Sequence, residues 1–97
     1  RRMVIQIVKF QTTLSGDEVL AIAKQRLAQF QSLPGLIQKY YVKVAEPDQY
    51  GGVYLWDSLE SFNAYRESDL AATISAAYKV NRPPSVEIFD TLFQLRV

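Results

Sequence analysis

The sequence predicts an α+β domain in which a four-stranded antiparallel sheet carries its helices on one face. Segments rich in Val, Ile and aromatic residues alternate with segments of helical spacing, in the order β-α-β-β-α-β. The central strand of this pattern, Gly52–Trp56, offers large apolar side chains to both of its faces. A strand of this kind must be covered on both faces.

The composition describes one ordinary globular domain, residues 1–97, with 48% hydrophobic residues and a net charge of +1. This charge argues against binding to nucleic acid or to an anionic membrane surface. The chain has no Cys and no His, so thiolate chemistry is excluded and the commonest metal and haem ligand is missing. We therefore expect no metal site and a cytoplasmic location. No apolar run approaches the ~20 residues of a membrane helix.

The first half of the pattern reads as a strand followed by a helix. Met3 to Gln11 is rich in Val and Ile and is predicted as the first strand. Ser15 and Glu18 have the spacing of a capping box, which begins a helix. Apolar residues then recur at helical spacing until Ser32, where Pro34 prevents the helix from continuing.

The second half begins with a hairpin. Leu36 to Ala45 is the second predicted strand, and turn residues 46–51 join it to Gly52–Trp56 as an antiparallel partner. Within the second strand, Ile37, Lys39, Tyr41 and Lys43 are predicted to share one face.

The remaining chain supplies a helical segment and the last strand. Either Asp57 or Ser58 caps the helix, whose apolar stripe begins at Leu59. Ser68-Asp69 interrupts this helix, and an Ala-rich helical piece follows over 70–80. Val86 to Leu95 is the last predicted strand.

This order is the split βαβ, or ferredoxin-like, arrangement, with one sheet face free of helices. All four strands nevertheless supply apolar residues to both faces. We therefore predict a homodimer that pairs the helix-free faces, because a monomer with such a face would aggregate. The alternative is a plain monomer with one polar face.

Several short motifs lie in the same order as in a known family. They are Gln6 in the first strand, Pro34-Gly35 followed by Lys39, Gly51-Gly52-Val53-Tyr54-Leu55, Ala64-Tyr65 and Phe89-Asp90. On these motifs the chain resembles the dimeric α/β-barrel superfamily and, within it, the YdhR-like monooxygenases. The resemblance covers nearly the whole chain. It implies a homodimer and an oxidoreductase that oxygenates a small molecule in a pocket between sheet and helices.

A second resemblance concerns mechanism. Trp56 stands just before a helix, as does a Trp in the haem-degrading and antibiotic-biosynthesis monooxygenases of the same superfamily. The haem-degrading members also need a histidine, which by counting from Trp56 falls near Ser75, and this chain has none. Haem degradation is therefore disfavoured. We expect a cofactor-independent monooxygenase acting on an apolar aromatic, quinol-like or polyketide-like substrate.

Eight residues form the predicted site. Those predicted to act in catalysis are Trp56, Lys39 and Tyr54, and those predicted to bind substrate are Tyr41, Tyr65, Phe62, Gln6 and Asp90. Each has a structural alternative: Trp56 as plain core, Lys39 as a solvated edge lysine, and Asp90 as a structural ion pair.

A different class of function stays open on the sequence. The chain could be a non-catalytic dimeric module that binds a small ligand, or a stress-response protein. The two classes predict different interiors, because an enzyme needs a cavity of a few hundred cubic ångströms with convergent polar groups.

Overall fold

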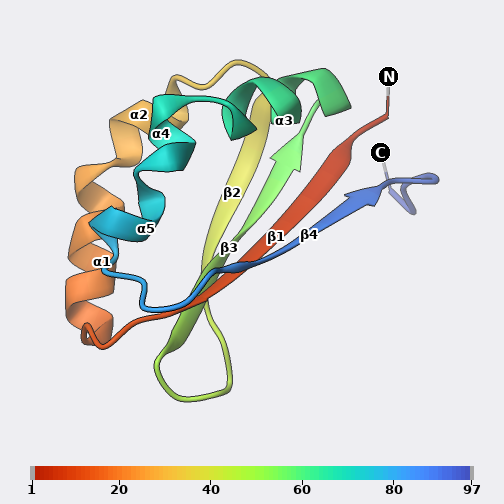
Figure 1. The fold of residues 1–97 in the computed structure, drawn as a ribbon. Coiled ribbons are helices and arrows are strands. Elements are labelled where there is room, and N and C mark those ends of the chain that lie inside the picture. Colours follow the sequence, from red (N-terminus) through yellow and green to blue (C-terminus); the bar gives the residue numbers. More distant parts are fainter. Residues whose placement is uncertain (1, 97) are drawn as a thin grey trace.

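The structure is a computed structural model that describes residues 2–96. Its strands are β1 (Val4–Gln11), β2 (Leu36–Lys43), β3 (Gln49–Trp56) and β4 (Ser85–Asp90). Its helices are α1 (Gly16–Gln25), α2 (Leu27–Gln31), α3 (Leu59–Arg66), α4 (Asp69–Ala72) and α5 (Ile74–Ala77). The strands form one antiparallel sheet in the order β2-β3-β1-β4, and the helices lie to one side of it (Figure 1). The predicted α+β, ferredoxin-like fold class is confirmed.

The core lies between the sheet and the helices. β1 and β3 pair with Val4 opposite Trp56 and Gln6 opposite Tyr54, so these four side chains share the face that the helices cover. All four are buried. Every second residue of each strand thus points its side chain into the same buried layer.

The first helical segment begins as predicted but is interrupted. The side chain of Ser15 accepts a hydrogen bond from the backbone N–H of Glu18, and the carboxylate of Glu18 accepts one from the N–H of Ser15. At Arg26 the backbone N–H bonds to the carbonyl of Ala23, three residues back. This tighter turn divides the predicted helix into α1 and α2.

The second helical segment is also divided. Ser58, rather than Asp57, is the N-cap of α3, because its hydroxyl accepts from the N–H of Ser61. Ser68 caps α4 in the same way. The side chain of Thr73 bonds to the carbonyl of Leu70, and the predicted continuous piece over 70–80 becomes two short helices.

Two strand predictions need correction. β2 has a register irregularity at Ile37, which leaves that side chain 56% exposed and turns Leu36 toward the core. The bulge therefore breaks the strict alternation predicted from Ile37 to Lys39. β4 ends at Asp90 instead of Leu95, where Asp90 pairs with Val4, the first residue of β1. One residue further, the N–H and the hydroxyl of Thr91 both donate to the carbonyl of Met3, and the ladder does not continue to Leu95.

The helix-free face of the sheet is apolar. Tyr40, Val42 and Phe89 are exposed there, and Ile7 and Val53 lie half-buried between them. The segment after β4 adds three apolar side chains, each more than 80% exposed: Leu92, Phe93 and Leu95. Both faces of the sheet are thus apolar, as the strand patterns predict.

Candidate functional site

A cavity of about 280 Å³ lies between the helix-facing side of the sheet and helices α1 and α5. Its walls are mainly apolar and include Val8, Phe10, Val19, Ala23 and Ile74. The polar side chains that reach it come from three parts of the chain: Lys39, Tyr41 and Lys43 of β2, Tyr50 and Tyr54 of β3, and Tyr78, which follows α5.

Glycine makes part of this space. Gly52 is buried and lies between Lys39 and Tyr54 on the cavity wall. A Cβ atom at Gly52 would lie 3.1 Å from Cε1 of Tyr54 and 3.3 Å from Cε of Lys39. Any larger side chain would therefore occupy the cavity or displace both residues.

Lys39 is the cation of the site. Its Nζ lies 3.5 Å from the ring centroid of Phe30, 4.3 Å from that of Tyr41 and 4.5 Å from that of Tyr54. Among residues 2–96, the ion pair within 4.0 Å joins Arg2 to Asp90, so no carboxylate of this part of the chain balances Lys39.

Burial lowers the pKa of Lys39 from its usual 10.5 to about 7, and the positive charge of Arg26 acts in the same direction. The ring faces oppose this shift, because each attracts an ammonium ion by about 0.5–2 kcal/mol. Desolvation is the larger effect at a group this deep in apolar surroundings. Lys39 therefore titrates near neutral pH, where an ordinary lysine stays charged.

The tyrosines of the cavity behave differently. Burial raises the pKa of Tyr54 well above its usual value, and a hydrogen bond with Tyr65 adds to this. Burial likewise raises the pKa of Tyr41, and it raises the pKa of Tyr78 to about 12. These phenols remain protonated at neutral pH, so they can donate hydrogen bonds to a ligand but are poor bases.

Arg26 ties the two helical segments together beside the site. Its guanidinium donates to Oγ1 of Thr73 at 2.9 Å and to the carbonyl of Leu70 at 3.3 Å. Its Nε is buried and lacks a partner among the described residues. Sequence reasoning missed this residue, which helical spacing places on an outward face.

A second hollow of about 280 Å³ lies on the other side of Lys39 and Tyr41, along α2 and the first half of β2. Its lining includes Leu27, Phe30 and the bulged Ile37. Lys39 and Tyr41 thus form a wall between the two spaces.

The structure brings together only some of the predicted site residues. Lys39, Tyr41 and Tyr54 line the cavity. Trp56 is fully buried in the layer next to it, and its Nε1 donates to Oε1 of Gln6 at 2.9 Å.

Phe62 and Tyr65 belong to the same buried layer. The Trp56 ring packs against Tyr65 at 5.1 Å between centroids and against the edge of Phe62 at 6.4 Å. Neither Phe62 nor Tyr65 lines the cavity, so in this structure they support the residues that do.

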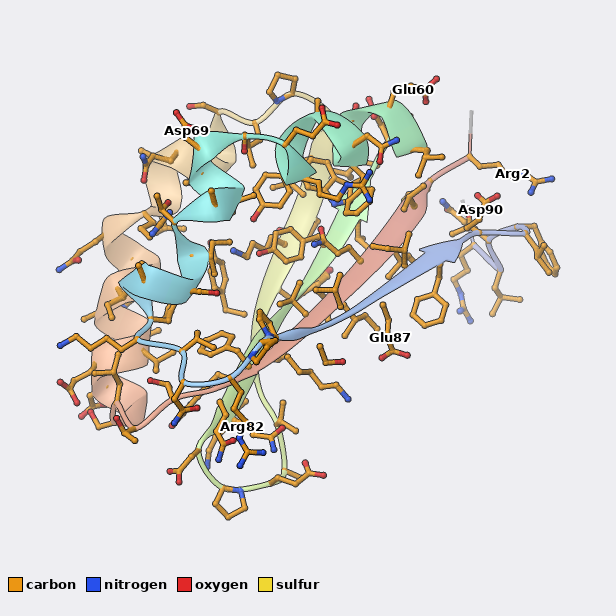
Figure 2. The ribbon with its side chains drawn as sticks, in the orientation of Figure 1. Arg2, Glu60, Asp69, Arg82, Glu87 and Asp90 are labelled. Atoms are coloured by element: carbon orange, nitrogen blue, oxygen red, sulfur yellow. The ribbon has the colours of Figure 1, made fainter. Side chains whose placement is uncertain are left out.

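Asp90 lies outside the site. It is exposed at the end of β4, where it points toward Arg2, and its Oδ2 is 3.3 Å from Nη1 of that arginine (Figure 2). The structural alternative for Asp90, an ion pair, is the arrangement seen. β4 is an edge strand that the helices do not cover, which explains why this residue remains in water.

Tyr50 and Tyr78 line the cavity but are absent from the predicted site. The sequence pattern places Tyr50 in the turn, but β3 begins at Gln49, so Tyr50 alternates with Gly52 and Tyr54 onto the cavity face. A third strand predicted to begin at Gln49 would have placed Tyr50 on the cavity face.

The residues that the structure describes offer neither a metal cluster nor a membrane helix. No three His, Cys, Asp or Glu residues within residues 2–96 gather closely enough to hold a metal ion. None of the helices described is long and apolar enough to cross a membrane.

A known protein family matches nearly the whole chain. The family model described as "Putative mono-oxygenase ydhR" matches residues 4–94. No curated protein matches the chain.

Several solved structures share the fold. SnoaB, described as a cofactor-independent oxygenase from Streptomyces nogalater, superposes with a TM-score of 0.77 at 14% identity over 100% of both chains. A "putative antibiotic biosynthesis monooxygenase" from Caulobacter crescentus gives 0.78 at 15% identity over 96% of this chain and 92% of its own. NE2512 from Nitrosomonas europaea, described as of unknown function, gives 0.75 at 17% identity over the same shares. At these identities the likeness concerns the fold alone.

Proposed function

Because the chain belongs to the ydhR family of putative mono-oxygenases, we propose that it is a cofactor-independent oxygenase of a small aromatic, quinol-like or polyketide-like substrate. The description of SnoaB as a cofactor-independent oxygenase supports the reaction type. The observation that carries the proposal is a lysine of lowered pKa in the wall of an apolar cavity beside protonated tyrosines.

The proposed reaction begins with a proton transfer. The neutral Nζ of Lys39 removes a proton from an activated C–H or O–H group of the substrate, and its pKa of about 7 suits a base at neutral pH. The phenols of Tyr41 and Tyr78 donate hydrogen bonds to the negative charge that forms on the substrate oxygen.

The substrate then supplies the electrons that reduce O₂. For an anthrone, the CH₂ group loses both hydrogens, one oxygen atom of O₂ becomes the new carbonyl oxygen, and the other leaves in water. The apolar wall favours an uncharged aromatic ligand.

Oxygen uptake with anthrone or a hydroquinone tests this proposal against a protein-free blank. We expect Lys39→Ala to reduce the enzymatic rate by about 10²-fold or more, because a positioned base contributes about that much. Lys24→Ala is the matched control, since Lys24 is exposed on α1, and it should behave as wild type. Uptake by wild type no faster than the blank on either substrate would remove the oxygenase assignment.

Trp56 belongs in the same experiment because the sequence predicts it to act in catalysis. In the structure it is fully buried and does not line the cavity. We expect Trp56→Phe to lower stability more than the rate of uptake. A loss of uptake as large as that of Lys39→Ala, in a folded variant, would return Trp56 to the catalytic set.

We also propose that two copies pair through the helix-free sheet face. This face exposes Tyr40, Val42 and Phe89, which a stable soluble protein normally covers. Light scattering at micromolar concentration should give the mass of a dimer, and Val53→Glu in the middle of this face should give a monomer. A monomer mass for wild type would refute the pairing.

The absence of Cys favours a cytoplasmic location for this dimer.

A further inference from the structure

The surroundings of Lys39 suit a reaction other than proton transfer. Its Nζ is held among the rings of Phe30, Tyr41 and Tyr54, and the side chain borders two hollows. An amine in an apolar pocket without a carboxylate partner can attack a carbonyl carbon. We propose that Lys39 binds a small aromatic aldehyde or ketone covalently, as an imine on its Nζ.

The charges around Lys39 favour the free amine. Arg26, between α1 and α2, is the nearby cation and opposes a second positive charge. Tyr41 of β2, Tyr54 of β3 and Tyr78 after α5 remain neutral phenols at pH 7 because burial raises their pKa. The pKa of Lys39 itself, about 7, leaves roughly half of the side chain unprotonated at that pH.

The cavity has room for an aromatic carbonyl compound. Its volume of about 280 Å³ exceeds the roughly 150 Å³ that holds benzene in an engineered apolar cavity. Gly52 has no side chain beside Cε of Lys39, so the path from the cavity to Nζ is not blocked from that side. The ring faces of Tyr41 and Tyr54 offer stacking surfaces.

The step conserves atoms and electrons. The lone pair of Nζ forms a bond to the carbonyl carbon, and the C=O π pair moves to oxygen, which gains a proton as nitrogen loses one. The hydroxyl of the resulting carbinolamine leaves as water with the remaining N–H proton, and the nitrogen lone pair forms the second N–C bond of the imine. No oxidant or reductant takes part, and O₂ is not needed, so the outcome does not depend on the proposed oxygenase activity.

Reductive trapping tests the proposal. The protein is mixed with benzaldehyde and cyanoborohydride at pH 7, and peptide mapping by mass spectrometry follows benzyl addition at each lysine. Lys43 is the matched control: it lies further along β2, lines the same cavity and is exposed.

At pH 7 about one ordinary lysine in three thousand is a free amine, against roughly half of Lys39. The lower basicity of Lys39 reduces its intrinsic nucleophilicity and offsets part of this advantage. We expect Lys39 to be labelled about tenfold faster than Lys43, or more, and the preference to disappear in urea.

Two outcomes would overturn the inference. The first is labelling of Lys39 no faster than Lys43, Lys24 and Lys79 in the folded protein. The second uses formaldehyde, which needs little space. If formaldehyde labels Lys39 preferentially and benzaldehyde does not, the amine is reactive but the cavity does not admit aromatic carbonyl compounds. A Lys43→Arg variant that keeps the full preference at Lys39 supports the assignment.

Discussion

Substitution of Gln6 by Leu tests the buried hydrogen bond next to the cavity. Trp56 is 0% exposed and Gln6 is 5% exposed, and the indole Nε1 donates to Oε1 of Gln6 at 2.9 Å. Leu has nearly the same size as Gln but offers no acceptor. Gln6→Leu therefore leaves the indole N–H buried without a partner and changes little else.

The expected cost follows from the geometry. A buried polar group that loses its partner costs about 1–3 kcal/mol. In a domain of this length, 1 kcal/mol corresponds to about 4–8 °C in Tm. We expect Gln6→Leu to destabilise the protein by about 2 kcal/mol and to lower Tm by about 10 °C.

A double-mutant cycle isolates this bond. Unfolding is followed by circular dichroism at one fixed protein concentration, because dimerisation would make Tm depend on concentration. In a Trp56→Phe background the indole donor is absent, so Gln6→Leu should then be nearly neutral, with a coupling of about 1–2 kcal/mol between the sites. If the two substitutions are additive within about 0.5 kcal/mol, the hydrogen bond does not determine the stability of this layer.

The cavity and its supporting turn give three more predictions. The folded-state pKa of Lys39 lies below its unfolded value, so the unfolded chain binds more protons between about pH 7 and pH 10. The free energy of unfolding should therefore rise through this window by at most about 1.4 kcal/mol per pH unit. Lys39→Met should abolish that slope in urea titrations while Lys43→Met retains it; equal slopes in both variants would contradict the lowered pKa. Gly52→Val should fill the cavity and cost about 1–3 kcal/mol through overpacking, so that oxygen uptake with anthrone falls sharply; unchanged uptake would place the substrate elsewhere. Gly35 has a φ of 80°, and an added Cβ would lie 2.7 Å from Oδ1 of Asp57. Gly35→Ala should therefore destabilise the protein by about 1–3 kcal/mol. A change under about 0.5 kcal/mol in thermal unfolding would argue against this turn geometry.

Local patterns in the sequence were sufficient for the fold. The period of two in β1, the capping box at Ser15 and the Pro34-Gly35 turn each depend on residues close together in the chain. Such signals predict where elements begin and which strand positions share a face. Alternation therefore places Lys39 with Tyr41 on one face of the second strand, and Tyr54 with Trp56 on one face of the third. The register of β2 against β3, which sets Lys39 opposite Tyr54, brings these two faces onto one surface.

Breaks inside the elements were not predictable in this way. Arg26 divides the first helical segment and bonds to Leu70 and Thr73, more than forty residues away. The bulge at Ile37 depends on how β2 meets β3. These features follow from contacts between distant segments. The residues next to Arg26 and Ile37 in the chain do not indicate such contacts.

Amino-acid order alone therefore determined the arrangement of strands and helices and the cationic, aromatic character of one sheet surface. Tertiary packing decided which members of that surface meet open space: Lys39 and Tyr54 border the cavity, while Trp56 is enclosed by Gln6 and Phe62. The reason is that alternation specifies a face, whereas a cavity forms only where side chains from separate elements, with Gly52 among them, leave volume unfilled.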